Sequence, residues 1–141
     1  MGEARVLMDR VTAAATSKDL KALEEFYAPD AVVMTPDQGE IRGVEGMVEW
    51  FRQFADALSD ITFEPIASHE AGNVAIDEGY FGGTHTGPLA LPTGESIEPT
   101  GRQIRVRSCD IVEVRDGLVV SHRFYYDQLE LLEQLGLAPQ P

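Results

Sequence analysis

The stretch RQIRVRSCDIVEVRDGLVVSHRFYYD, residues 102–127, decides the expected fold. Two long runs rich in Val, Ile and aromatic residues flank the dipeptide Asp116-Gly117, which is a preferred pair for a two-residue hairpin loop. The pattern therefore predicts two antiparallel strands, residues 102–114 and 118–127. Two more β-rich runs, residues 61–72 and 73–87, meet at the turn residues EAGN. We expect a four-stranded antiparallel meander in the second half of the chain.

The first half of the chain has helical periodicity instead. Residues 3–16 form one amphipathic pattern, and Asp19 can cap a second helix whose apolar stripe runs from Leu20 to Tyr27. Residues 31–43 indicate a small hairpin, residues 44–58 have the clearest 3.6-residue repeat, and a short helix ends at Gly136. Helices followed by an antiparallel sheet predict an α+β fold in which a curved sheet encloses a cone-shaped cavity.

Length and charge limit the classes of partner. The 141 residues suit one domain, which we expect over residues 1–137 with a frayed tail at 138–141. The 24 acidic and 11 basic residues give a net charge of −13, which disfavours nucleic acid and anionic membranes as partners. The first residues, MGEARVLMDR, lack the apolar core of a secretory signal, and the lone Cys109 permits no internal disulfide. These features predict a cytoplasmic protein.

Motifs for cofactors are missing from the sequence. It contains no glycine-rich nucleotide fingerprint and no G-x-S-x-G nucleophile elbow. The three histidines, His69, His85 and His122, are scattered without the spacing of metal ligands. We therefore expect neither a metal nor a cofactor.

Strand alternation identifies two carboxylates that share a face with apolar residues. Asp110 falls in a row with Val106, Ser108 and Val112, and burial of such a carboxyl can make it an acid or base near neutral pH. The alternative is a core carboxylate that is satisfied by neighbouring hydrogen bonds. Glu78 is a weaker candidate, in a row with Val74, Ile76 and Tyr80.

Asp127 and His85 are candidates because each stands at the end of an expected strand. Asp127, flanked by Tyr125 and Tyr126, is either a base at the mouth of the cavity or the N-cap of the last helix. His85, within GTHTG, either points to the rim of the pocket or bonds to a backbone carbonyl. We expect further contacts to substrate from Trp50, Phe54, Leu89 and Leu91, the two leucines as a lid, although packing alone would also account for both aromatic residues.

Four segments together resemble one known family. They are GTHTG with the following PTG, the strand end DIVEVRDGLVVSH, Asp127 followed by QLELLEQLG, and the early KDLKALEEFYAPDAVV. With them the chain resembles the SnoaL-like polyketide cyclases, also called ester cyclases, of the nuclear-transport-factor-2-like superfamily. The resemblance implies an α+β half-open barrel, also described as cystatin-like, with an apolar pocket and a homodimer through the outer face of the sheet.

The resemblance also implies a reaction. An acidic residue removes a proton α to the carbonyl of a polyketide-like ester or ketone, and the enolate closes a ring by intramolecular aldol addition without metal or cofactor. Asp127 matches the base, with His85 and Asp110 as polar neighbours, and His85, Tyr125 or Tyr126 as donor to the enolate oxygen. The expected ligand is a small apolar carbonyl compound.

Two other functions stay open. The first is a non-catalytic binder that holds a small apolar ligand in the same pocket. The second is an epoxide hydrolase, which would need an Asp-Arg-Asp set such as Asp110, Arg107 and Asp127. Alternation places Arg107 and Asp110 on opposite faces of their strand, which argues against it.

Overall fold

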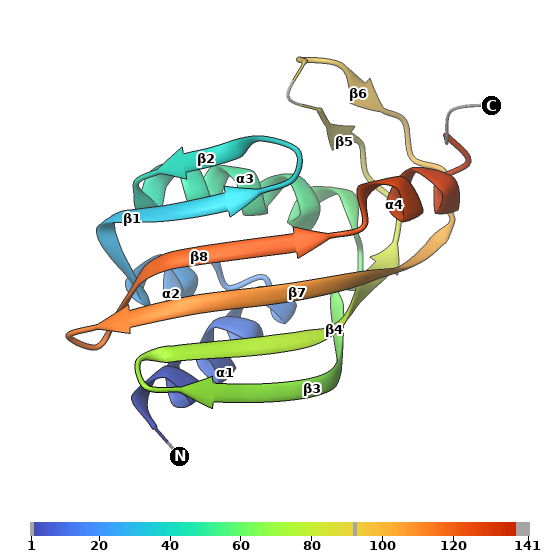
Figure 1. Cartoon of the computed structure of the whole chain (residues 1–141). Coiled ribbons are helices and arrows are strands. Elements are labelled where there is room, and N and C mark those ends of the chain that lie inside the picture. Colours follow the sequence, from blue (N-terminus) through green and yellow to red (C-terminus); the bar gives the residue numbers. More distant parts are fainter. Residues whose placement is uncertain (1, 92, 138–141) are drawn as a thin grey trace.

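A computed structural model describes residues 2–91 and 93–137 (Figure 1). The tail expected at residues 138–141 lies outside these ranges. The helices are α1 (Glu3–Thr16), α2 (Leu20–Glu25), α3 (Val44–Ala57) and α4 (Gln128–Gln134). The strands of the main sheet are β1 (Tyr27–Thr35), β2 (Gly39–Arg42), β3 (Thr62–Ala71), β4 (Val74–Thr84), β7 (Gln103–Arg115) and β8 (Leu118–Tyr126). A separate small hairpin joins β5 (Leu89–Ala90) to β6 (Ser96–Ile97).

The main sheet confirms the expected fold class. Its strand order is β2-β1-β8-β7-β4-β3, and β3, β4, β7 and β8 form the predicted antiparallel meander. Figure 1 shows α1, α2 and α3 on one face of this open, curved sheet, and α4 at the end of β8. The sheet is mixed because β1 lies parallel to β8. No helix in the part of the chain that the structure describes is long and apolar enough to cross a membrane.

The start of β1 corrects one sequence prediction. Tyr27 does not belong to the second helix, which ends at Glu25, but begins β1 opposite Val119 of β8. An aromatic residue suits a strand as well as a helix stripe, and pairing with β8 decides between them here. This placement matters for the site because it directs Tyr27 into the core, where only 4% of its surface is exposed.

Two carboxylates from the sheet hold α1 in place. Glu70 of β3 accepts from the backbone N–H groups of Gly2 and Arg5, at 2.9 and 3.1 Å, which have no partner within the helix. The guanidinium of Arg5 in turn donates two bonds to the carboxylate of Asp77 on β4, at 2.7 and 2.8 Å. Both side chains of this second pair are buried, so α1 is fixed to the inner face of the sheet by a bidentate ion pair.

The core is divided into two parts along the sheet. One part lies under α1 and α2 and includes Val33, Val112 and Val119. The other lies between α3 and α4 and includes Trp50, Val106 and Leu131. The outer face of the sheet has no covering helix in Figure 1 and carries Tyr125, which is 46% exposed. The homodimer expected through that face stays a prediction.

Candidate active site

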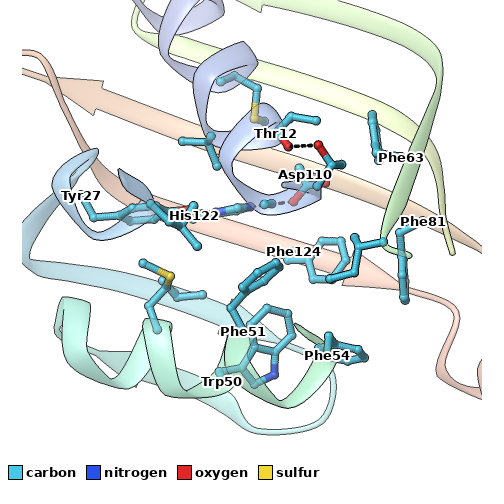
Figure 2. Close-up of a pocket in the computed structure, with 18 of the residues that line it drawn as sticks. Thr12, Tyr27, Trp50, Phe51, Phe54, Phe63, Phe81, Asp110, His122 and Phe124 are labelled. Atoms are coloured by element: carbon cyan, nitrogen blue, oxygen red, sulfur yellow. Dashed lines mark hydrogen bonds and ion pairs between the residues drawn. The ribbon is translucent and has the colours of Figure 1, made fainter. Parts of the chain in front are cut away.

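A pocket of about 110 Å³ lies between α1, α3 and the concave face of the sheet (Figure 2). Most of its wall is apolar. Aromatic rings come from α3 and from three strands: Trp50, Phe51, Phe54, Phe63, Phe81 and Phe124. Several of these rings meet edge to face, for example Trp50 and Phe124 with centroids 5.6 Å apart, an arrangement that stabilises aromatic clusters. Trp50 and Phe54, expected from the sequence to contact substrate, therefore line the pocket.

Polar side chains gather at one end of this pocket. Asp110 of β7 and His122 of β8 both line it, and the His122 Nε2 atom is 2.6 Å from Asp110 Oδ1. Tyr27 of β1 lies on the other side of the imidazole ring, with its hydroxyl oxygen 2.6 Å from His122 Nδ1. Figure 2 shows Thr12 of α1 pointing toward Asp110 from above the same end. The apolar pocket thus ends in a carboxylate that is bonded to a histidine and, through it, to a tyrosine.

Hydrogen-bond chemistry limits where the protons lie among Asp110, His122 and Tyr27. An ionised carboxylate only accepts, so His122 Nε2–H donates to Asp110, and the direction of the bond between Nδ1 and the Tyr27 hydroxyl depends on whether Nδ1 carries a proton. Burial, together with the nearby charge of Asp110, raises the pKa of Tyr27 well above its ordinary value. Tyr27 therefore keeps its hydroxyl proton at neutral pH.

Asp127 does not share the pocket with Asp110. Its side chain accepts from the backbone N–H of Glu130 at 3.0 Å, which makes it the N-cap of α4, and it does not line the pocket. The expectation of Asp127 at the cavity mouth is therefore wrong, because the strand-to-helix junction turns its carboxylate toward the helix. Its neighbours differ from each other: Tyr125 is exposed, whereas Tyr126 is buried in the core with Leu131.

His85 is also separate from the pocket. It is 1% exposed and forms an isolated β-bridge with Leu58. Its Nδ1 atom accepts from the backbone N–H of Thr100 at 3.2 Å, and the Thr100 hydroxyl oxygen lies 3.0 Å away. Burial lowers the pKa of His85, so the ring is neutral at pH 7. Leu89, expected in a lid with Leu91, is instead buried in the core around α3, while Leu91 is half-buried and does not line the pocket.

The alternation expected along β4 is reversed. Ala75 and Asp77 face the core, whereas Glu78 is exposed and Tyr80 packs under the Arg105 guanidinium, 3.6 Å from its ring centroid. Neither Glu78 nor Tyr80 lines the apolar pocket. Both rows of this strand carry apolar residues, so its own pattern was ambiguous. The inward row contains Asp77 because Arg5 from α1 neutralises that carboxylate.

His122 is the site residue that sequence reasoning missed. The register explains why: the pairing of β7 with β8 shifts between Glu113 and Val114, after which Val112 lies opposite His122 and Asp110 opposite Phe124. Directly opposed residues share a face, so the shift brings His122 to the face of Asp110 as its diagonal neighbour. Without that bulge, the hairpin register from Asp116-Gly117 would have placed them on opposite faces.

The fold is that of the SnoaL-like domains. The model of this family matches residues 8–122, and the chain belongs to it. Comparison with curated protein sequences found no match.

Solved structures extend the likeness over nearly the whole chain. TsrD from Streptomyces laurentii is 29% identical, with 96% of each chain covered and a TM-score of 0.78. A candidate SnoaL-like polyketide cyclase from Jannaschia sp. CCS1 is 15% identical over 97% of this chain and 94% of its own, with a TM-score of 0.83. An epoxide hydrolase from M. tuberculosis is 16% identical over 94% and 89%, with a TM-score of 0.71. The last two show a common fold.

Proposed function

We propose that the protein is a cofactor-independent enzyme of the cyclase or isomerase type, in which Asp110 is the general base. Its substrate is an apolar ketone or ester that enters the aromatic pocket with its carbonyl group toward Asp110. The observation that carries the proposal is the placement of Asp110, bonded to His122, at the polar end of an otherwise apolar pocket. Exclusion of water from such a wall strengthens each electrostatic interaction with the reacting atoms.

The reaction follows from this placement. The Asp110 carboxylate takes a proton from the carbon α to the carbonyl, and the C–H electron pair forms the enolate. In a cyclase the enolate carbon then bonds to a second carbonyl carbon of the same molecule. The alkoxide oxygen formed there takes the proton back from Asp110, which leaves the enzyme unchanged. The His122 N–H stabilises the carboxylate form of Asp110 between turnovers.

The pocket limits the part of the substrate that is enclosed. Its volume of about 110 Å³ is close to that of an apolar cavity of about 150 Å³ that holds benzene. The enclosed part is therefore one ring or a short acyl segment. Thr62, an exposed residue of the lining at the start of β3, marks the side on which a longer substrate would extend into solvent.

Epoxide hydrolysis has less support. Among the described residues that line the pocket there is no arginine. Arg107 points to the outer side of the sheet and pairs with Glu130 at 3.4 Å. The Asp-Arg-Asp set considered from the sequence does not assemble, because Asp110 lines the pocket whereas Arg107 and Asp127 lie outside it, beside Glu130 of α4. Non-catalytic binding of a small apolar ligand is the remaining alternative, and the following experiment separates it.

Acetophenone is a suitable probe because it has one ring and exchangeable protons α to its carbonyl. In D₂O the wild-type protein is expected to accelerate exchange of these protons for deuterium, measured by NMR. Asp110→Asn should lower the rate by about 100-fold, the smaller end of the effect of a general base. Asp127→Asn, which keeps an N-capping side chain, is the matched control and should exchange like the wild type.

Two results would contradict the proposal. Unchanged exchange in Asp110→Asn, with the fold intact by circular dichroism, would remove Asp110 from the mechanism. Binding of acetophenone by the wild type without any acceleration of exchange would favour the non-catalytic binder.

A further inference from the structure

Tyr27 completes a row of side chains behind the proposed base. Its hydroxyl lies 2.6 Å from His122 Nδ1, on the side of the ring opposite to Asp110. The two rings are nearly parallel, with an interplanar angle of 15° and centroids 6.0 Å apart. Because Tyr27 is almost fully buried, its hydroxyl has no bulk water as an alternative acceptor. The bond to Nδ1 is thus costly to lose.

That bond opposes protonation of the imidazole ring. A proton on Nδ1 would convert this atom from an acceptor into a donor. The Tyr27 oxygen could accept from it, but the hydroxyl proton would then lose its own acceptor and would have to turn away from the ring, or leave by ionisation. Leaving a buried hydroxyl unpaired costs about 1 to 3 kcal/mol. Ionisation is no easier, since burial already raises the pKa of Tyr27. Tyr27 therefore favours the neutral ring with its proton on Nε2.

The surrounding charges act in the other direction. Asp110 is the charged group in contact with His122, and Asp77 of β4 lies opposite Asp110 in the register of the sheet. Arg5 of α1 is bonded to Asp77. The residues of α1 and α3 that line this end of the pocket, including Thr12 and Met47, are uncharged. Two carboxylates against one guanidinium favour a cationic imidazole, so a neutral ring would require a specific contact that opposes them.

We propose that Tyr27 is a positioning residue that keeps His122 neutral, so that Asp110 faces the pocket as a carboxylate bonded to a neutral N–H rather than paired with an imidazolium. A cation beside Asp110 would stabilise its ionised form and make it a weaker base. The consequence for rate rests on the proposed function of Asp110. The protonation state of His122 does not depend on the proposed function, and it can be measured separately.

The test is a pH titration of His122 by ¹⁵N NMR, with the His122 signals assigned by their loss in His122→Gln. In the wild type we expect the neutral form with its proton on Nε2 throughout pH 6 to 8. In Tyr27→Phe the ring should gain a proton at a pH about one unit higher than in the wild type, the shift expected from loss of one buried hydrogen bond of about 1.4 kcal/mol. The matched control is Tyr126→Phe, a second buried tyrosine that does not contact His122, which should titrate like the wild type.

Each outcome decides the inference. Coincident titrations of Tyr27→Phe and the wild type would overturn it, as would an imidazolium in the wild type at pH 7, a result that needs no variant to fold. If the titration shifts as expected, the low-pH limb of acetophenone exchange should move to higher pH by the same amount. If neither the wild type nor any variant accelerates exchange, yet the titration of His122 shifts in Tyr27→Phe, the proposed function fails and the role of Tyr27 in setting the protonation state of His122 stands.

Discussion

The ion pair between Arg5 and Asp77 offers the most direct test of how the fold is held together. Only 10% and 5% of the two side chains are exposed, and both nitrogen–oxygen distances are below 3 Å, at 2.7 and 2.8 Å. Removing one partner of a buried pair costs about 3 to 5 kcal/mol, because the other charge is left without compensation. In Asp77→Ala, Arg5 keeps its bond to Asp9 at the exposed edge of α1. We therefore expect a loss near the lower limit, about 3 kcal/mol.

The assay is urea unfolding followed by far-UV circular dichroism, with Arg5→Met, Asp77→Ala and the double variant Arg5→Met/Asp77→Ala. Each single variant should lower the free energy of unfolding by about 3 kcal/mol, whereas the double variant should lose less than either, since it buries no charge. Losses below about 1 kcal/mol in both single variants, or a double variant that loses the sum of the two, would refute the role of this pair.

Two further predictions concern residues outside the pocket. Burial lowers the pKa of His85 below 6.5. Below that pH the unfolded chain therefore binds more protons than the folded one. The stability that the neutral His85 ring provides at pH 7 is lost as the pH falls through 6.5. His85→Gln should thus show a smaller drop in urea midpoint between pH 7 and pH 5 than the wild type, and an equal drop would contradict this. Asp127→Ala removes the N-cap bond to Glu130 and should cost about 1 kcal/mol without slowing acetophenone exchange, whereas slower exchange in the folded variant would place Asp127 in the mechanism.

The sequence predicted the meander, the helices and the inward-facing position of Asp110, because each depends on local patterns. The period of α3 and the turn at Asp116-Gly117 are short-range signals, and alternation along one strand was enough to place Asp110. His122 depended on the register between two strands after a bulge, which no single-strand pattern contains.

The orientation of β4 and the start of β1 were missed for a similar reason. Asp77 faces inward only because a helix far away in the sequence supplies Arg5. Tyr27 is a strand residue only because β1 pairs in parallel with β8. Both features depend on contacts between distant segments, so only the folded chain reveals them. The same holds for the site, where Tyr27 and His122 come from strands 95 positions apart.

Two buried groups of side chains, Arg5 with Asp77 and Tyr27 with His122, flank the Asp110 carboxylate from opposite sides of β7. Asp77 of β4 lies directly opposite Asp110, and residues paired in this way are on one face of the sheet, close enough for like charges to interact. Arg5 bonds to Asp77 and offsets its charge beside Asp110. On the β8 side, the proposed role of Tyr27 is to hold His122 in a state that donates one hydrogen bond to Asp110 without adding a positive charge. Arg5 therefore offsets the negative charge next to Asp110, and Tyr27, in its proposed role, keeps Asp110 from being paired with a cation, which together would leave a carboxylate able to accept a proton from carbon.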